Sequence, residues 1–335
     1  MRIALAVLLL AACAAARADD LFGISMQLDG KREQKLAALD DLGVAWVRTT
    51  VIWERYEPSE GRFEWKWFDD IVADAEAHHL HLMVTILAIS RWGSSALPDN
   101  YGHEGYQNVS PPKEVDAYAR FVEALAARYK GRGLAWQFEN EVNGKVFWSG
   151  SREEYLDLLK ASYAAAHRGD PACTVLPAGL AGVFPNSNRL EGRLARHREW
   201  LDAILATKCF DAIDMHDYSP PEEGNPFGLT FEQYLEAYEG WLKEAGVKAP
   251  VWMSETGVNS APIQVGEQRV VYTPEQQAKD LEQMYACARK HGIAHVFWLR
   301  LVDHEEAAFS FVGLAGEDRK PKPAAETYRR LAKGK

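Results

Sequence analysis

Outside its first residues the sequence has no long apolar run. No later stretch approaches the roughly 20 consecutive apolar residues that a membrane-spanning helix requires, so we expect no integral membrane span. Basic residues are in deficit, with 38 Lys and Arg against 48 Asp and Glu. An acidic surface of this kind argues against a nucleic acid or an anionic membrane as a partner.

The N-terminal segment is the exception. Residues 1–18 carry one basic residue near the start, an apolar stretch and then small residues, which is typical of a cleaved export signal. Ordinary cleavage, which we favour, would leave a domain of residues 19–335 with 36 basic and 48 acidic residues and a net charge of −12. The stretch Leu10-Ala11-Ala12-Cys13 also resembles a bacterial lipobox. We therefore expect a periplasmic or secreted protein, or a lipoprotein anchored through Cys13.

Cysteine is scarce, with four residues in the chain. Cleavage after residue 18 would leave Cys173, Cys209 and Cys287, an odd number that cannot pair completely within one chain. Cys173 and Cys209 stand near the starts of successive predicted strands and could form one disulfide. The alternative is three buried reduced thiols.

Motifs for bound nucleotides and metals are missing as well. The first predicted strand leads into QLDGKRE at residues 27–33, which is not a Gly-rich dinucleotide turn, and no GKS or GKT phosphate loop occurs. The ten histidines show no HExxH spacing. We therefore expect neither a metal nor an organic cofactor.

The chain does contain a regular alternation of short apolar strands and amphipathic helices, without a low-complexity linker. The predicted strands cover residues 21–26, 44–52, 81–89, 134–138, 173–178, 212–216, 251–254 and 295–299. The predicted helices cover residues 31–42, 65–79, 115–129, 152–167, 196–206, 230–245, 274–291 and 323–333. Thr230 and Gln233 have the spacing of a capping box.

Eight βα units predict an α/β fold, a (β/α)8 TIM barrel formed by a single domain. Parallel strands must be covered on both faces or close on themselves, and eight repeats match the closed barrel. A doubly wound open sheet is the alternative. In a barrel, catalytic residues lie at the C-terminal ends of the strands.

Two carboxylates stand at such strand ends. Asn140 and Glu141 follow the fourth predicted strand in WQFENEVN, and Glu255 follows the seventh in VWMSETG. Strands four and seven face each other across a barrel mouth. Cleavage of an acetal with retention needs a carboxylic acid to protonate the leaving oxygen and a carboxylate, about 5 to 5.5 Å away, to attack the anomeric carbon.

With these residues the sequence resembles glycoside hydrolase clan A over nearly all of residues 19–335. It is most similar to families 39 and 5, with a preference for family 39. The segments that carry the resemblance are VAWVRTTVIWERYEPSEGRFEWKWFDDIV, FENEVNGKVFWSG, FDAIDMHDYSP and VWMSETGV. The family usually has Trp before the Asn-Glu pair and Pro after it, whereas this chain has Phe138 two residues before Asn140 and Val142 after Glu141.

The resemblance implies roles for several residues. Glu141 matches the general acid/base, Glu255 the nucleophile, and Asn140 the residue that binds the sugar 2-hydroxyl. Arg48 would keep the nucleophile ionised, unless it forms only a surface ion pair. Of the His-x-Tyr pair, His216 would line the sugar site, unless it is a core histidine, and Tyr218 would donate to the nucleophile.

Aromatic residues at strand ends are candidates for stacking on a sugar. The resemblance implies that Trp298, at the end of the eighth predicted strand, forms the floor of the site, with a core role as the alternative. Trp53, Trp92 and Trp148 follow strands two, three and four and would add subsites or pack internally.

The expected function is retaining hydrolysis of a β-linked oligo- or polysaccharide by a monomer. One alternative is a carbohydrate-binding barrel without catalysis. Another is a metal-dependent sugar-processing barrel, for which His216 and Asp217 are the suitably placed ligands. The glycan, its linkage and exo or endo action stay open, because residues 90–112 and 179–195 would shape the substrate site.

Overall fold

The computed structural model describes residues 19–28, 30–98, 109–182, 190–265, 268–304 and 310–334. The predicted signal segment 1–18, with Cys13, lies outside these residues. So do the middle of the 90–112 loop and residues 183–189 of the 179–195 loop.

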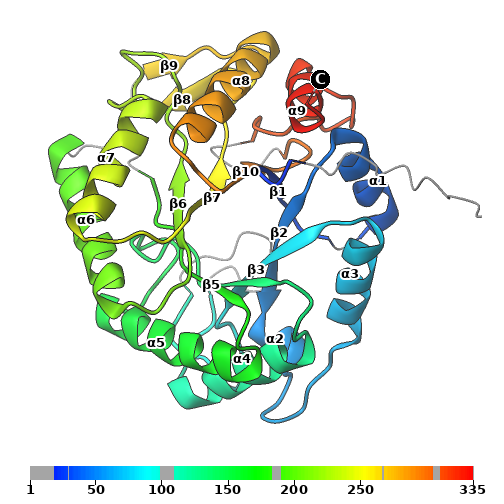
Figure 1. The fold of residues 1–335 in the computed structure, drawn as a ribbon, viewed down its shortest axis with the longest axis vertical. Helices are drawn as coiled ribbons and strands as arrows, with labels where there is room; N and C mark the ends of the chain where they lie inside the picture. Colours follow the sequence, from blue (N-terminus) through cyan, green and yellow to red (C-terminus); the bar gives the residue numbers. More distant parts are fainter. Residues whose placement is uncertain are drawn as a thin grey trace, which may run out of the picture.

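Eight parallel strands form the centre of the molecule (Figure 1). They are β1 Phe22–Ser25, β2 Trp46–Ile52, β3 His81–Leu87, β4 Ala135–Phe138, β5 Thr174–Pro177, β6 Ile213–Asp217, β7 Val251–Thr256 and β10 His295–Leu299. Their order is β5-β4-β3-β2-β1-β10-β7-β6. The ring closes between β5 and β6, where the Asp211 N–H donates to the Val175 carbonyl at 2.8 Å and Leu180 bridges to Met215. The predicted (β/α)8 barrel of a single domain is confirmed.

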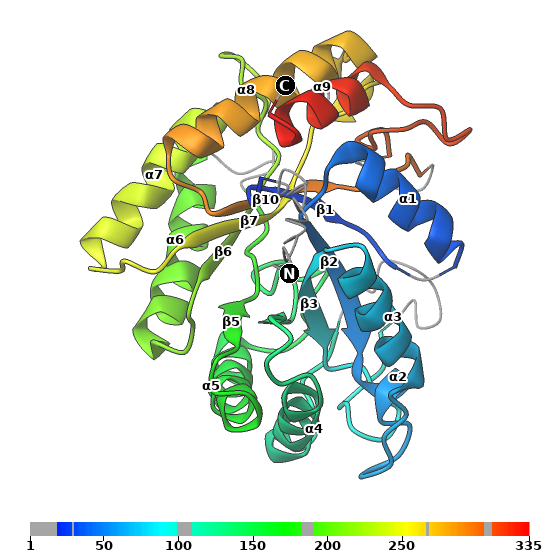
Figure 2. The same ribbon diagram turned by 45° about the vertical axis from the view of Figure 1, so that its right-hand side comes forward.

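Helices surround the strands, as Figures 1 and 2 show. They are α1 Arg32–Leu42, α3 Lys66–Ala77, α4 Val115–Arg128, α5 Arg152–Gly169, α6 Leu190–Thr207, α7 Phe231–Glu244, α8 Pro274–Lys290 and α9 Pro323–Ala332, with a one-turn helix α2 Trp53–Tyr56 after β2. Among the described residues, none of these helices is long and apolar enough to cross a membrane.

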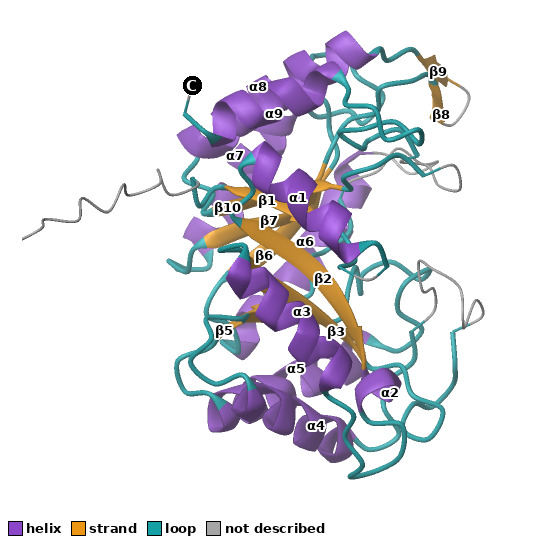
Figure 3. Cartoon of the chain, turned by 90° about the vertical axis from the view of Figure 1, so that its right-hand side faces the viewer, coloured by secondary structure: helices purple, strands orange, loops and turns teal. Residues whose placement is uncertain are grey.

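Three local features differ from the prediction. α6 begins at Leu190 rather than 196 and includes Gly192, whose unfavourable helix propensity of about 1 kcal/mol is small enough to be outweighed by packing. β7 continues to Thr256. A hairpin of β8 Ile263–Val265 and β9 Gln268–Val270 follows β7 and projects beyond the barrel beside other loops (Figure 3).

The barrel interior has an apolar end and a polar end. Met83, Leu176, Trp252 and Phe297 fill one part of the interior as a buried cluster with two alanines. Phe297 lies so close to β1 that a Cβ at Gly23 would be 2.6 Å from its ring. The polar side chains described below lie further along the same strands, toward their C-terminal ends.

The three cysteines of the described chain are free thiols. Cys173 is buried, and the Sγ atom of Cys209 donates to the Thr207 carbonyl at 3.3 Å. The pairing of Cys173 with Cys209, which the sequence left open, is therefore not made.

The predicted capping box at α7 is confirmed. The Gln233 N–H donates to the Thr230 hydroxyl at 3.2 Å, and the Thr230 N–H donates to the Gln233 side chain at 2.9 Å. Thr230→Ala should lower the free energy of unfolding by about 1 kcal/mol, because the Gln233 N–H at the helix start loses the hydroxyl that accepts from it. Urea denaturation measures this. Thr230→Ser should keep most of the stability, and an equal loss in both variants would contradict a capping role.

Candidate active site

The backbone after β4 is held in an unusual conformation. Glu139 and Glu141 have φ angles of 67° and 47°, in the left-handed region that side chains other than glycine rarely adopt. Each such residue costs about 1–2 kcal/mol. The Glu139 N–H donates to the Ile86 carbonyl at 3.1 Å, and the Glu141 N–H donates to the Gly179 carbonyl at 3.0 Å. Neighbouring strands thus fix a turn that places Glu141 at the rim, and strain of this kind clusters at functional sites.

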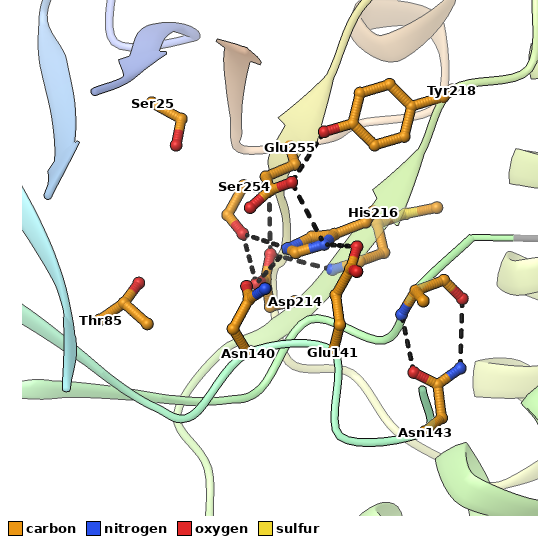
Figure 4. Close-up of polar contacts among 12 residues, drawn as sticks. Ser25, Thr85, Asn140, Glu141, Asn143, Asp214, His216, Tyr218, Ser254 and Glu255 are labelled. Carbon is orange, nitrogen blue, oxygen red and sulfur yellow. Dashed lines mark hydrogen bonds and ion pairs between the residues drawn. The ribbon is translucent and has the colours of Figure 1, made fainter. Parts of the chain in front are cut away.

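A register shift in β7 positions the second glutamate. Met215 is paired with Met253, but the next residue, His216, is paired with Glu255. Ser254 is therefore the extra residue of a bulge, and bulges re-aim the side chains beside them. As a result, Glu255 and His216 face the same space over the barrel (Figure 4).

Arg48, on β2, is the cation of the site and is almost fully buried. Its Nη1 group donates to Glu255 at 2.5 Å, and its Nη2 group donates to the Asn140 side-chain oxygen at 2.6 Å. Both Nε and Nη2 also donate to the Gln137 side-chain oxygen, at 3.1 and 2.8 Å. The guanidinium therefore connects β2, β4 and β7 and is no surface ion pair.

Glu255 is placed in an environment that favours its charge. Besides Arg48, the Tyr218 hydroxyl donates to it at 2.7 Å, and His216 Nδ1 lies 3.8 Å from it. Burial alone would raise the pKa of Glu255, but the charges of His216 and Arg48 and the Tyr218 hydrogen bond outweigh it and hold the pKa well below its usual range. Glu255 is thus an anion at neutral pH.

Glu141 is placed in the opposite kind of environment. Burial raises its pKa, and the negative charge of Glu255 adds to this, against opposing contributions from His216 and Arg48. Carboxylate oxygens of Glu141 and Glu255 and a ring nitrogen of His216 all lie within 4.8 Å of one another. At this range two carboxyl groups titrate as a pair, and Glu141 is the member that keeps a proton to higher pH.

His216 links the two carboxyl groups to a deeper polar chain. Its Nδ1 atom lies 2.8 Å from Glu141, and its Nε2 atom lies 2.9 Å from the Ser254 hydroxyl. Burial would lower the pKa of His216, but the negative charges of Glu255, Glu141 and Asp214 raise it. Glu141 and His216 thus share one proton across their hydrogen bond. A Cβ at Gly179 would lie 2.3 Å from the imidazole, so glycine is required there.

The polar chain below His216 was missed by the sequence analysis. The Ser254 hydroxyl donates to Asp214 at 2.5 Å, and Gln137 donates to the same Asp214 oxygen. Thr85 donates to Gln137 at 2.6 Å. These residues connect His216 back to Arg48 and close a buried network. Polar residues at inward positions of otherwise apolar strands were the signal that could have revealed them.

Asn140 directly precedes Glu141 and, like Glu255, is bound by Arg48. Because its side-chain oxygen accepts from Arg48, its orientation is fixed with the NH2 group as the donor for a ligand. Asp217, the other metal-ligand candidate, directly follows His216 on β6 and is not part of the cluster of Glu141, His216 and Glu255. Its carboxylate accepts from the Ser219 hydroxyl at 2.9 Å, and burial raises its pKa to about 7.

Three of the four predicted stacking residues are buried packing residues in this structure. Trp53 is fully buried, donates to Glu57 at 2.6 Å and lies edge-on to Trp92 and Tyr118. Trp148 is also buried and donates to the Ser151 carbonyl at 3.0 Å. A ring without exposed surface cannot stack on a sugar, so the packing alternative holds for both in this structure.

The third buried ring is Trp298, whereas Trp92 is partly exposed. Trp298 is fully buried, and its indole nitrogen donates to the Val312 carbonyl at 2.7 Å, so it exposes no stacking face here. Trp92 is half-buried, with its indole nitrogen bound to the Glu57 carbonyl at 2.7 Å. The position of a residue at a strand end therefore does not determine whether its ring reaches the surface.

The trio of Glu141, His216 and Glu255 also has the spacing of metal ligands. Against a divalent ion stands the Arg48 guanidinium, which lies 2.5 Å from one oxygen of Glu255 while Tyr218 donates to the other. A cation bound there would have to displace these donors and sit beside a fixed positive charge. The arrangement fits acid and base chemistry of two carboxyl groups better.

Comparisons with known proteins point to the same class of enzyme. A family model described as Beta-galactosidase, glycoside hydrolase family 42, matches residues 28–168. This match includes Asn140 and Glu141 but ends before β5, so the half of the barrel with His216 and Glu255 lies outside it. No curated protein matches the sequence.

Solved structures share the fold at low sequence identity. A family 39 glycoside hydrolase from Bacteroides cellulosilyticus WH2 is 18% identical with a TM-score of 0.68, over 95% of this chain and 64% of that one. A family 39 enzyme from Xanthomonas axonopodis pv. citri is 14% identical with a TM-score of 0.70, over 95% of this chain and 67% of that one. A family 10 endoxylanase from a sugarcane soil metagenome is 18% identical with a TM-score of 0.65, over 93% of this chain and 98% of that one. These structures show the shared fold, and the partial family match supports the resemblance to clan A and a glycosidase as the class of enzyme.

Glu139 provides a test of the site's electrostatics. Burial raises its pKa to about 8, although its carboxyl accepts from the Ala88 N–H at 2.7 Å. The unfolded chain therefore releases this proton first as the pH rises. The stability that this group contributes should decline between its usual pKa of 4.5 and about 8, by up to about 1.4 kcal/mol per pH unit, and level off above.

Glu139→Gln should remove this decline, because glutamine stays neutral at every pH. Urea denaturation at about pH 5 and about pH 8 measures the effect as the difference between wild type and variant. The wild type should lose stability relative to the variant as the pH rises. If the free energy of unfolding changed with pH equally in wild type and variant, the buried Glu139 would be charged and the raised pKa would be contradicted.

Proposed function

We propose that this protein is a retaining β-glycosidase in which Glu141 is the general acid/base and Glu255 the nucleophile. The observation that carries the proposal is the separation of the two carboxyl groups, whose oxygens lie within 4.8 Å. Retaining enzymes have carboxyl groups about 5–5.5 Å apart, whereas inverting enzymes need about 6.5–9.5 Å to admit a water molecule. The opposite pKa shifts of Glu141 and Glu255 support the same division of roles.

In the first step, the Glu255 carboxylate attacks the anomeric carbon while Glu141 gives its proton to the leaving oxygen. The C–O bond to the leaving group breaks, and an ester bond forms between Glu255 and the sugar. Arg48 and Tyr218 each hold one oxygen of Glu255, which orients the carboxylate for attack.

In the second step, Glu141 is ionised and removes a proton from water, which attacks the anomeric carbon and breaks the ester bond. Two inversions at one carbon restore the original configuration. His216 is hydrogen-bonded to Glu141 and stabilises its anionic form between the steps. Asn140 presents its NH2 group to the hydroxyl next to the anomeric carbon.

The substrate class is a β-linked oligo- or polysaccharide, cut by a protein that most resembles family 39. The family model is described as Beta-galactosidase, and solved neighbours include a β-xylosidase from Caulobacter crescentus and xylanases. Galactosides and xylosides are therefore the first substrates to test. Trp92 is the half-buried candidate for a subsite, and Trp298 would need rearrangement near Val312 to expose its ring.

We also propose that the protein is exported and that the mature protein, residues 19–335, is a monomer. The proposal rests on the signal-like segment 1–18, which leaves cleavage or lipidation at Cys13 as alternatives. Mass determination of the protein from the periplasmic or membrane fraction would distinguish the two. Size-exclusion chromatography with light scattering tests the oligomeric state.

Replacement of each glutamate should give different products in the presence of azide. Glu255→Ala removes the nucleophile, so azide attacks the substrate directly and gives a glycosyl azide of inverted configuration. Glu141→Ala keeps the covalent intermediate, which azide then opens with net retention. We expect turnover of aryl β-glycosides without azide to fall by about 10²- to 10⁴-fold for Glu141→Ala, and at least as much for Glu255→Ala.

Glu33→Ala, on α1, is the matched control and should leave turnover unchanged. Proton NMR of the glycosyl azides assigns the anomers, and melting curves exclude unfolding. Normal turnover by Glu255→Ala, on a substrate that the wild type cleaves, would refute the nucleophile assignment. Rates that depend on added metal and vanish with chelator would favour the metal-dependent alternative, and no turnover of any glycoside that binds would favour the binding barrel.

The hydrogen bond from Tyr218 should also set the pH profile. Tyr218→Phe removes a donor that lowers the pKa of Glu255, so this pKa should rise. Because the nucleophile must be ionised, the acidic limb of kcat/KM should move to higher pH. Tyr234→Phe removes a buried hydroxyl bonded to His197 outside the site and is the control. Identical acidic limbs in wild type and Tyr218→Phe would contradict this role.

A further inference from the structure

A second cluster of reactive side chains lies on the outer helices. Glu232 is in the first turn of α7, Cys287 is near the end of α8, and His291 is the residue at the C-terminal cap of α8. A carboxylate oxygen, the thiol sulfur and a ring nitrogen of these residues all lie within 4.8 Å of one another. None of the three is part of the site at the strand ends.

The spacing on α8 explains why two of them meet. Residues four apart lie on one face of a helix, and the His291 N–H donates to the Cys287 carbonyl at 3.0 Å, so helical geometry continues to His291. Glu232 approaches this face from α7. Two neighbouring helices thus bring together three donors of different chemical type.

The imidazole of His291 is held in the orientation of a ligand. Its side chain is 9% exposed, and its Nδ1 atom lies 3.1 Å from a carboxylate oxygen of Glu239. The Nε2 atom is buried without a hydrogen-bond partner, since the nearest Glu232 oxygen is 3.6 Å away. A carboxylate that accepts from Nδ1–H leaves the lone pair on Nε2, which is the arrangement that usually supports metal-bound histidines.

We propose that Glu232, Cys287 and His291 bind a zinc ion that ties α7 to α8. Thiolate, imidazole and carboxylate are the three ligand types of Zn²⁺, at about 2.0–2.3 Å, and water would complete a tetrahedral site. On binding, a Zn–S bond forms and the Cys287 thiol proton passes to solvent. Rotation of the half-exposed Glu232 side chain can bring its oxygen into the first coordination shell.

The positive charge of Lys290 opposes zinc binding at Glu232. Lys290 pairs with the Glu232 carboxylate, so zinc must displace this ammonium group. Replacement of Lys290 should therefore tighten metal binding, whereas a purely structural ion-pair cluster would only lose stability. The effect of Lys290→Gln on metal affinity therefore distinguishes the two interpretations.

Cobalt(II) is the probe, because it replaces zinc in such sites and a thiolate ligand gives it an intense near-ultraviolet charge-transfer band. The chelator-treated wild type should show this band on titration with Co²⁺, and Zn²⁺ should abolish it by displacement. Cys287→Ser should lose the band, while Cys209→Ser, which changes another half-buried thiol, should keep it. The cluster at Glu141 contains no thiol and cannot produce the band.

Graded effects complete the test. Glu239→Gln should weaken Co²⁺ binding about tenfold through the orientation of His291. Lys290→Gln should tighten it, and both exposed substitutions leave the fold intact. Zn²⁺ should raise the Tm of the wild type but not that of Cys287→Ser. A wild type without the band, or with a band that survives Cys287→Ser, would overturn the proposal, and neither result bears on the glycosidase.

Discussion

The ion pair between Arg48 and Glu255 is the interaction on which the site depends. A carboxylate within 4.8 Å of a second carboxyl group repels it by an energy on the order of 3 kcal/mol if both are charged. The guanidinium, 2.5 Å from Glu255, acts with His216 and Tyr218 to keep Glu255 as the charged member of the pair. Glu141 has no guanidinium bound to it and shares a proton with His216, so a proton remains available for transfer.

The rest of the barrel holds this asymmetry in place. Arg48 is buried and would be costly if unpaired, and its donors are bound by Glu255, Asn140 and Gln137. Gln137 in turn binds Asp214, which fixes Ser254 and through it His216. The strained turn at Glu139 and Glu141 persists because hydrogen bonds from strands on both sides hold it. The proton between Glu141 and His216 is therefore controlled by contacts that extend across the barrel.

Residues whose position along a strand determines their role could be predicted from sequence. Glu141, Glu255 and His216 lie together because C-terminal ends of parallel strands meet at one rim, and periodicity is sufficient to find those ends. Arg48 lies nearer the start of β2 and reaches them with its long side chain. Thr230 was identified because capping is a local interaction.

Features that depend on distant contacts could not be predicted. Trp53 and Trp298 occupy strand ends, but their burial depends on α4 and on the segment around Val312. The bulge at Ser254 follows from two neighbouring strands, and Asp214 acquires its importance only from partners on β4 and β7. The Cys287–His291 pair is four residues apart in the sequence, yet without Glu232 and Glu239 from α7 it is an ordinary helix face.

Trapping of the covalent intermediate tests the central claim most directly. A 2-deoxy-2-fluoro glycoside with a good leaving group, of the sugar that the enzyme cleaves, slows both steps but the second step more, so the glycosyl-enzyme accumulates. Peptide mass spectrometry should then find one added sugar on the peptide that contains Glu255. The assignment of Glu255 as nucleophile would be contradicted if the sugar were found on another residue. It would also be contradicted if the enzyme hydrolysed the fluoro glycoside at the normal rate without forming an adduct.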